Sequence, residues 1–145
     1  MLMKATSHRE LDEEALLAVY AGSLRDDGQV LRYLREDFFT IPGAACYIWQ
    51  EAGEYKSVLR VEPYLDGFLI AGLETRPDSR NRGYASRLLA AVADAYAGKP
   101  LYAHIRRKNT ASIRVHTRCG FCKLFDYGKM LDGSVDSRYN TYRKM

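Results

Sequence analysis

Hydrophobic side chains change their spacing several times along the chain, and these changes divide it into helices and strands. Residues 11–21 carry apolar side chains at helical spacing behind an acidic first turn, which suits the positive end of a helix dipole. A second, weaker helical pattern covers residues 29–39, and Ile-Pro-Gly-Ala at 41–44 interrupts it. The pattern therefore predicts two consecutive helices in the first third of the chain.

Residues 45–75 have the pattern of three successive strands. Apolar and aromatic residues fill this stretch, and turn signals occur in it at Glu-Ala-Gly-Glu (51–54) and Leu-Asp-Gly-Phe (65–68). Strands joined by such short turns are expected to lie antiparallel in one sheet.

The second half of the chain alternates between helical and strand patterns. An amphipathic stretch at 84–98 ends at Gly98 and Pro100, which both stop helices. Asn109 is a favourable N-cap for a further helix, and Gly120 is a favourable C-terminal stop for it. The remaining expected elements are a strand at 101–105 and a closing pair of strands at 121–131 and 137–145.

With a strand before the first helix, the expected order is strand-helix-helix-strand-strand-strand-helix-strand-helix-strand-strand. This order predicts a mixed α/β fold with a single, mostly antiparallel sheet flanked by helices. A chain of 145 residues has the length of one domain, so residues 1–145 are expected to form a single domain. Its hydrophobic fraction of 47% and charged fraction of 28% are ordinary for a globular protein.

Targeting and cysteine usage indicate the compartment. The N-terminal segment lacks a basic region followed by an apolar run, so it resembles neither a signal peptide nor a membrane span. Three cysteines are an odd number, which disfavours a disulfide framework. We therefore expect a cytoplasmic protein with no membrane partner.

The net charge of +4 conceals an asymmetry between the two halves. Residues 1–75 carry 7 Lys and Arg against 13 Asp and Glu, whereas residues 76–145 carry 15 against 5. Such a split indicates that the basic half meets an anion, and nucleic acid, a phosphorylated cofactor and an acidic membrane surface all qualify. A solvated basic face without a partner is the alternative.

The loop before the helix at 84–98 is the best candidate for an anion site. Free backbone N–H groups at a helix start, together with the helix dipole, bind anions. Gly83 allows a phosphate to approach the backbone closely and Ala85 leaves that approach open, while Arg80 and Arg82 add positive charge. The loop has neither the triphosphate-binding motif nor the three-glycine dinucleotide motif, and a plain helix start gives the same pattern.

The sequence PDSRNRGYASRLL in this region resembles the pyrophosphate-binding motif of the GNAT superfamily, the acetyl-CoA-dependent N-acetyltransferases. That motif is Arg or Gln, two residues, Gly, one residue, then Gly or Ala, and Arg80, Gly83 and Ala85 fit it. Pro77 stands where the family often has proline. The resemblance extends in element order over residues 11–145, so it implies one acetyltransferase domain.

A second stretch, NTASIRVHTRCGF, resembles the family's next motif of Asn, a small residue, an aromatic residue and Gly-Phe. The matching positions are Asn109, Ala111, Ser112, Gly120 and Phe121. Many family members carry a tyrosine seven residues after this Asn, and it protonates the departing thiolate of coenzyme A. His116 takes that position here, so the sequence departs from the family at the proton donor.

Cys119 and Cys122 form a C-x-x-C pair at the end of this motif, a spacing found in redox dithiols and zinc sites. By the resemblance, the helix ends at Gly120, which places Cys119 at a helix C-terminus, where the dipole disfavours a thiolate. No second C-x-x-C supplies the further ligands of a structural zinc site. We expect neither thiol chemistry nor a bound metal.

The resemblance implies where acetyl-CoA binds. In the family the pantetheine arm lies along the fourth strand and bonds to its backbone, here at Leu73 and Thr75. The diphosphate rests on the amides of residues 81–86. The expected cofactor-binding residues are Leu73, Thr75, Arg80, Asn81, Arg82, Gly83, Tyr84, Ala85, Ser86, Asn109 and Ser112.

It also implies direct attack by a primary amine on the thioester of acetyl-CoA in a ternary complex. The amine must be neutral, the developing oxyanion needs a donor and the thiolate needs a proton. A backbone N–H near Leu73 is the implied donor, Glu74 is the first choice for the base and Glu62 the second, although either carboxylate could be a solvated strand residue. His116 is the candidate acid, or else it only packs against the cofactor. The other phenols that could reach the sulfur are Tyr84, Tyr127 and Tyr139.

The acceptor side is defined less sharply by the sequence. Arg60, Tyr47 and Trp49 lie on expected strands, where they could line the acceptor site or belong to the core. The acidic N-terminal half suits a cationic amine approaching opposite the basic cofactor side.

Two other functions are consistent with the sequence. A non-catalytic acyl-CoA-binding sensor accords with the missing tyrosine at position 116, and a nucleic-acid-binding module would use the basic run at 106–108. No aromatic-rich RNA-binding strand motif is present, so we expect acetyl-CoA and an amine, and not nucleic acid, as the partners. Sheet edges near the C-terminus could pair two copies into a homodimer.

Overall fold

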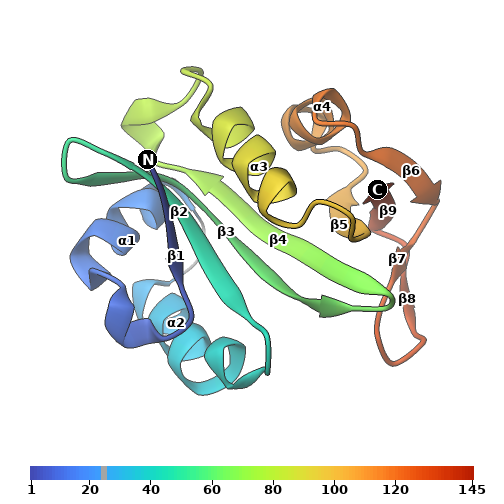
Figure 1. Cartoon of the computed structure of the whole chain (residues 1–145), viewed down its shortest axis with the longest axis horizontal. Coiled ribbons are helices and arrows are strands. Elements are labelled where there is room, and N and C mark those ends of the chain that lie inside the picture. The colour runs from blue at the N-terminus through green and yellow to red at the C-terminus, as the bar shows by residue number, and fades with distance from the viewer. Residues whose placement is uncertain (24–25) are drawn as a thin grey trace.

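The computed structural model describes residues 1–23 and 26–145, and Figure 1 shows its strands assembled into a twisted sheet with helices on both sides. The strands are β1 (Leu2–Ala5), β2 (Ala45–Glu51), β3 (Glu54–Tyr64), β4 (Gly67–Thr75), β5 (Leu101–Arg106), β6 (Cys122–Phe125), β7 (Gly128–Lys129), β8 (Val135–Asp136) and β9 (Tyr139–Lys144). The α-helices are α1 (Glu13–Val19), α2 (Asp27–Arg32), α3 (Tyr84–Ala95) and α4 (Thr110–Arg118). Short 3-10 or π turns are η1 (His8–Glu10), η2 (Tyr20–Gly22), η3 (Tyr33–Asp37), η4 (Phe38–Thr40) and η5 (Pro77–Ser79). None of the described helices is long and apolar enough to cross a membrane.

The main sheet has the strand order β1-β2-β3-β4-β5-β9-β6. Its neighbours are antiparallel except for β4 and β5, which are parallel. The parallel pair is the one joined by a helix, since α3 connects β4 to β5, as a parallel crossover requires. The expected mixed, mostly antiparallel sheet flanked by helices is confirmed.

The two faces of the sheet bury separate cores, because successive strand side chains point to opposite sides. Ile48 of β2 packs with Leu16 of α1 and Val30 of α2. Its neighbour Tyr47 packs with the core beneath α3, which includes Leu88. Figure 1 accordingly shows α1 and α2 beside β1 to β3, and α3 running alongside β4.

β4 and β5 separate soon after they begin. They pair only where Phe68, Leu69 and Ile70 face residues 101–103. Beyond Ile70 the edge of β4 that faces β5 has no strand partner among the described residues. The backbone of β4 from Ala71 onward is therefore free on that side to bond to something other than a strand.

Aspartate caps decide where the first two helices begin. The Asp12 side chain accepts a hydrogen bond from the Ala15 amide at 3.1 Å, and Asp26 accepts one from the Gln29 amide at 3.2 Å. Such caps satisfy amides that have no partner within the helix. α1 therefore begins later than the apolar pattern indicated, and α2 begins earlier. The stretch expected to be one helix at 29–39 continues as a π turn and then a 3-10 turn.

The closing strands are more divided than the sequence indicated, so the expectation of one strand at 121–131 is wrong. The Thr141 hydroxyl donates to the Tyr127 carbonyl at 2.7 Å and accepts from the Lys129 amide at 3.2 Å. These side-chain bonds replace backbone pairing between residues 127–129 and β9. The strand that pairs with β9 therefore ends with β6. β7 then pairs with β8 in a small separate hairpin, seen at the right-hand end of the sheet in Figure 1.

Candidate active site

A cleft of about 700 Å³ opens where β4 ends and α3 begins. Its walls are the end of β4, the loop that follows, the first turn of α3 and one side of α4. The lining residues are Leu73, Glu74, Thr75, Ser79, Arg80, Asn81, Gly83, Tyr84, Ala85, Ser86, Asn109, Ala111, Ser112, Arg114, Val115 and Arg118. Of the residues expected to bind the cofactor, only Arg82 is not part of this lining.

The backbone at the start of α3 leaves its amides open to the cleft. Gly83 precedes the helix with φ of 82°, and no side chain caps the first turn. The first helical bond runs from the Arg87 amide to the Gly83 carbonyl, so the amides just before Arg87 have no acceptor within the helix. A Cβ atom added to Gly83 would meet no atom within 4 Å. The geometry fits a phosphate group resting on these amides.

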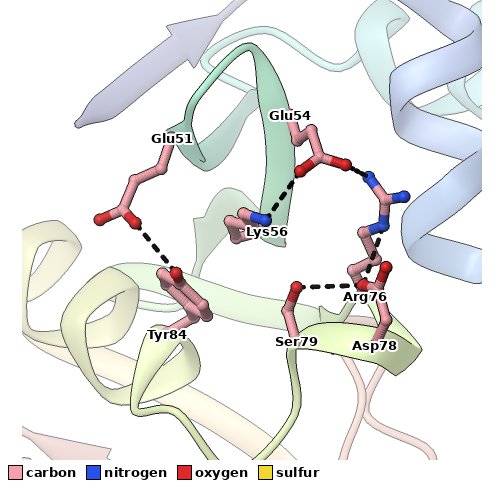
Figure 2. Close-up of polar contacts among 7 residues, drawn as sticks. All are labelled: Glu51, Glu54, Lys56, Arg76, Asp78, Ser79 and Tyr84. Carbon is pink, nitrogen blue, oxygen red and sulfur yellow. Dashed lines mark hydrogen bonds and ion pairs between the residues drawn. The ribbon is translucent and has the colours of Figure 1, made fainter.

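The loop that carries these amides is fastened to the turn between β2 and β3. Figure 2 shows the Arg76 guanidinium between the carboxylates of Glu54 and Asp78, with Lys56 on the other side of Glu54. The Arg76 Nε atom lies 3.0 Å from Asp78, and Lys56 Nζ lies 3.0 Å from Glu54. The Ser79 hydroxyl completes the chain with a 3.1 Å hydrogen bond to Asp78. This network holds the loop in place without using a residue of the α3 first turn.

The first residue of α3 is fastened to the same turn. The Tyr84 hydroxyl donates to Glu51 at 2.9 Å, as Figure 2 shows, and the Trp49 indole donates to the other Glu51 oxygen at 3.2 Å. The bonds from Trp49 and Tyr84 lower the pKa of the Glu51 carboxyl. Tyr84 therefore directs its phenol toward the β2–β3 turn, which does not suit the role of a proton donor to the sulfur.

A second cavity of about 330 Å³ lies between the separating strands β4 and β5. It is lined by Ile70, Ala71, Gly72, Leu73, Glu74, Ala103, His104, Ile105, Arg106, Asn109, Ser112, His116 and Tyr139. We call it the channel. Leu73, Glu74, Asn109 and Ser112 line both the cleft and the channel, so the two cavities meet at these residues.

Glu74, the first candidate for the base, lies at this junction. Glu62, the second candidate, does not. The side chain of Glu74 is 29% exposed, and its Oε1 atom lies 3.4 Å from Arg80 Nη2. Its carbonyl accepts a 2.8 Å hydrogen bond from the Ser57 hydroxyl, which fixes the strand end. Glu62 is half-buried and lines neither cavity, and burial raises the pKa of its carboxyl. The structure therefore favours the first of the two carboxylates expected as the base.

His116 is buried in the wall of the channel. Its Nδ1 atom lies 2.7 Å from the Ser112 carbonyl oxygen, and because a carbonyl cannot donate, Nδ1 carries the hydrogen. Its ring meets the Phe121 ring edge-on at 5.2 Å. Burial lowers the pKa of His116, so the imidazole is neutral near pH 7 and its Nε2 atom has no proton. Of the two roles that the sequence left open, this geometry favours packing.

The other aromatic candidates divide by position. Tyr139 lines the channel, so it is the phenol placed to reach a sulfur there, whereas Tyr127 is exposed and stacks on Phe125 outside both cavities. The Tyr47 hydroxyl donates to the Tyr96 hydroxyl at 3.1 Å in the core beneath α3. Tyr47 is thus a core residue and does not line the acceptor side.

Sequence reasoning did not identify Arg114 and Arg118, although both line the cleft. Both are exposed residues of α4. They follow Ala111 by three and seven positions, which places all three on one helical face. That spacing was the available signal, and it indicates two further positive charges on the side of α4 that lines the cleft.

The C-x-x-C cysteines lie apart from both cavities. Cys119 is the C-terminal cap of α4, and burial raises the pKa of its thiol. Cys122 is the exposed first residue of β6. Burial also raises the pKa of Cys46 to about 12. Residues 1–23 and 26–145 contain no group of three or more His, Cys, Asp or Glu side chains arranged to hold a metal ion.

Part of the chain resembles known acetyltransferases in sequence. The sequence model described as Acetyltransferase (GNAT) family matches residues 9–121. A curated N-acetyltransferase of Streptomyces griseus is 40% identical over 57 residues, which are 37% of this chain and 29% of that protein. The chain therefore aligns with less than a third of that relative's length.

Solved structures share the fold over nearly the whole chain. A GNAT family acetyltransferase from Bacillus cereus has a TM-score of 0.76 at 19% identity, covering 100% of this chain and 97% of that one. A ribosomal-protein-alanine N-acetyltransferase from Brucella melitensis has a TM-score of 0.71 at 22% identity, covering 100% and 99%. The PaiA N-acetyltransferase from Thermoplasma acidophilum, solved in complex with coenzyme A, has a TM-score of 0.68 at 12% identity, covering 99% and 98%. At these identities the likeness establishes the fold.

Proposed function

Because the chain belongs to the acetyltransferase (GNAT) family, we propose that it transfers the acetyl group of acetyl-CoA to a primary amine by direct attack in a ternary complex. The observation that supports this most strongly is the junction of cleft and channel at Leu73, Glu74, Asn109 and Ser112. The cleft receives most of the acyl donor, the thioester lies at the junction with its sulfur reaching the channel, and the acceptor approaches it from the channel. Residues 1–145 act as one acetyltransferase domain in this proposal.

The cleft offers acetyl-CoA backbone donors and positive charge. The amides of residues 81–86 bind the diphosphate, and Gly83 leaves room for it. The free edge of β4 at Leu73 and Thr75 bonds to the pantetheine arm in the manner of an added strand. Arg114 and Arg118 attract the remaining phosphate from α4. The residues that complete the site are Arg80, Arg82, Tyr84, Ala85, Ser86, Asn109 and Ser112.

The residues at the junction suit the three needs of the reaction. The acceptor nitrogen attacks the thioester carbon, so a C–N bond forms and the C–S bond breaks. Glu74 takes the amine proton, directly or through a water, and the N–H near Leu73 donates to the developing oxyanion. The sulfur leaves as a thiolate and takes its proton from Tyr139 or from water. His116 holds the channel wall, since its neutral form has no proton to give toward the channel.

The other partners follow from the same site. Phosphates of acetyl-CoA account for Arg114 and Arg118, so we assign no nucleic-acid partner to them. A homodimer stays a prediction, and β6 is the sheet edge at which a second copy would pair. A sensor that binds acyl-CoA without turnover would use the same cleft, so only turnover separates it from an enzyme.

The test is a panel of amines incubated with acetyl-CoA and a thiol-detecting dye. The panel contains polyamines, aminoglycosides, amino acids, peptides with free N-termini and peptides with free lysine side-chain amines. We expect amine-dependent release of free thiol with at least one class, and its loss in Glu74→Gln at neutral pH. Binding of acetyl-CoA without any amine-dependent release would favour the sensor.

A further inference from the structure

Arg60 in β3 carries a buried positive charge that forms no ion pair with the part of the chain that the structure describes. The residue is 8% exposed, and its Nε atom is buried with no hydrogen-bond partner. Within residues 1–23 and 26–145, no hydrogen bond or ion pair to this side chain is found. The guanidinium instead lies 5.2 Å from the Tyr33 ring centre and 5.8 Å from that of Phe38. Burying an unpaired charge is costly, and an anion bound from outside the described residues would lower that cost.

The guanidinium lies behind Gly72, which is part of the channel wall, whereas Arg60 is not itself a lining residue. A Cβ atom added to Gly72 would be 2.4 Å from Arg60 Nη1 and 2.7 Å from Cζ, so the guanidinium fills the space above this glycine. Gly72 has φ of 65° and lies where the pairing of β3 and β4 shifts register. It also lines the channel. Because Gly72 has no side chain, the buried cation packs directly against a residue that lines the channel.

Two carboxylates share this face of the sheet with Arg60. Glu62 follows Arg60 by two residues on the same strand, and Glu74 pairs with Val58, two residues before Arg60. Neither forms an ion pair with Arg60, although the Arg60 charge opposes the burial that raises the pKa of Glu62. One unpaired cation with carboxylates on either side is complementary to a molecule that carries both charges.

We propose that the acceptor is an amine that also carries a carboxylate, and that this carboxylate binds to the Arg60 guanidinium while the amine lies beside Glu74. The assignment rests on the proposed function for the identity of the reacting amine. A planar carboxylate matches the fork of a guanidinium and can take two hydrogen bonds from it. A doubly charged phosphate suits the site less, since the half-buried Glu62 would repel it. The acceptor class is therefore that of free amino acids and of peptides recognised through their C-terminal carboxylate.

The test measures binding to the protein saturated with coenzyme A, so that it does not depend on turnover. Calorimetry compares α- and ω-amino acids and short peptides with their matched carboxamides. For the best ligand, wild type should bind the carboxylate at least about tenfold more tightly than the amide. Arg60→Met should reduce this ratio to about one and leave coenzyme A affinity unchanged. Arg35→Met is the matched control. Arg35 is an exposed arginine of η3, the turn that also carries Tyr33, and its replacement should keep the ratio.

Each outcome decides the matter. Equal binding of acid and amide, an undiminished preference in Arg60→Met, or no binding by any member of the panel would show that Arg60 only packs on Tyr33 and Phe38. If Arg60→Met does not fold, Arg60→Lys keeps the charge without the fork and should lose most of the preference. Carboxylate-selective binding without acetyl transfer would contradict the proposed function alone. Transfer to amines regardless of a carboxylate would contradict this inference alone.

Discussion

The Nδ1 atom of His116 lies 2.7 Å from the carbonyl oxygen of Ser112, one helical turn earlier in α4. This contact assigns the imidazole hydrogen to the nitrogen that faces the helix backbone. His116→Phe keeps a ring against Phe121 and removes both nitrogens. Turnover with saturating substrates should stay within about threefold of wild type, with the same alkaline limb in its pH profile. A loss of about a hundredfold or more, the size of a general-acid contribution, would restore the acid role.

The same burial makes stability depend on pH. The pKa of His116 is lowered in the folded protein, so the unfolded chain binds its proton more readily, and stability increases with pH in this range. The stability that neutral His116 contributes to the folded protein is complete above the unfolded pKa of about 6.5. It is lost as the pH falls from there toward the pKa of the folded protein. The melting temperature of wild type should therefore fall relative to His116→Phe as the pH is lowered from about 7 to 5. His104 is present in both proteins and cancels. A constant difference would contradict the burial of a neutral His116.

Gly83→Glu tests the place of the diphosphate. A glutamate there puts a side chain and a negative charge where a phosphate would rest, and its backbone strain is roughly 1–2 kcal/mol. Gly98→Glu is the matched control, since Gly98 has a similar φ of 85° and equally open surroundings. Acetyl-CoA at a hundred times its dissociation constant should stabilise wild type and Gly98→Glu by about 2.7 kcal/mol, seen as a higher melting temperature. Gly83→Glu should lose that shift, and a retained shift would place the cofactor elsewhere.

Arg76 fastens the cofactor loop from outside the cleft. In Arg76→Ala the loop loses its bonds to Glu54 and Asp78, so the amides of the α3 start should be less well placed. The KM for acetyl-CoA should rise roughly threefold to tenfold while kcat changes little. Glu54→Ala should raise the KM for acetyl-CoA less in the Arg76→Ala protein than in wild type, because the two side chains share one interaction. Arg138→Ala, which removes a similar surface pair with Asp136, should change neither constant, and a matching rise there would refute the positional role.

Local signals in the sequence were sufficient to predict much of the local structure around the cleft. Asn109 accepts from the Ser112 amide as an N-cap should, and Gly83 has the positive φ that a glycine before a helix permits. Both depend on a few neighbouring residues, so a linear pattern contains them. The end of the sheet was harder, because Thr141 redirects residues 127–129 through contacts that only the folded chain creates.

The acceptor side depends on the pairing register of β2, β3 and β4, which could not be read from the hydrophobic pattern of the sequence. Tyr47 pairs with Leu59, so Arg60 lies on the opposite face, and a shift of one residue would have reversed this. The approach of Arg60 to Gly72 requires the irregular pairing of β3 and β4. Alternation alone could show that two faces exist, but it could not show which of them carries the channel.

Direct transfer from acetyl-CoA to an amine is the central claim, and intact mass spectrometry over a single turnover tests it most directly. Protein is mixed with a stoichiometric amount of acetyl-CoA, first alone and then with an amine from the active class. Without amine, the protein mass should stay unchanged, which means that no side chain, including the exposed Cys122, becomes acetylated. With amine, one acetyl group should appear on the amine for each coenzyme A released, and Gly83→Glu should give neither product. An acetylated protein that forms before the amine is added and then passes its acetyl group to the amine would contradict direct attack, and so would thiol release with no acetylated amine.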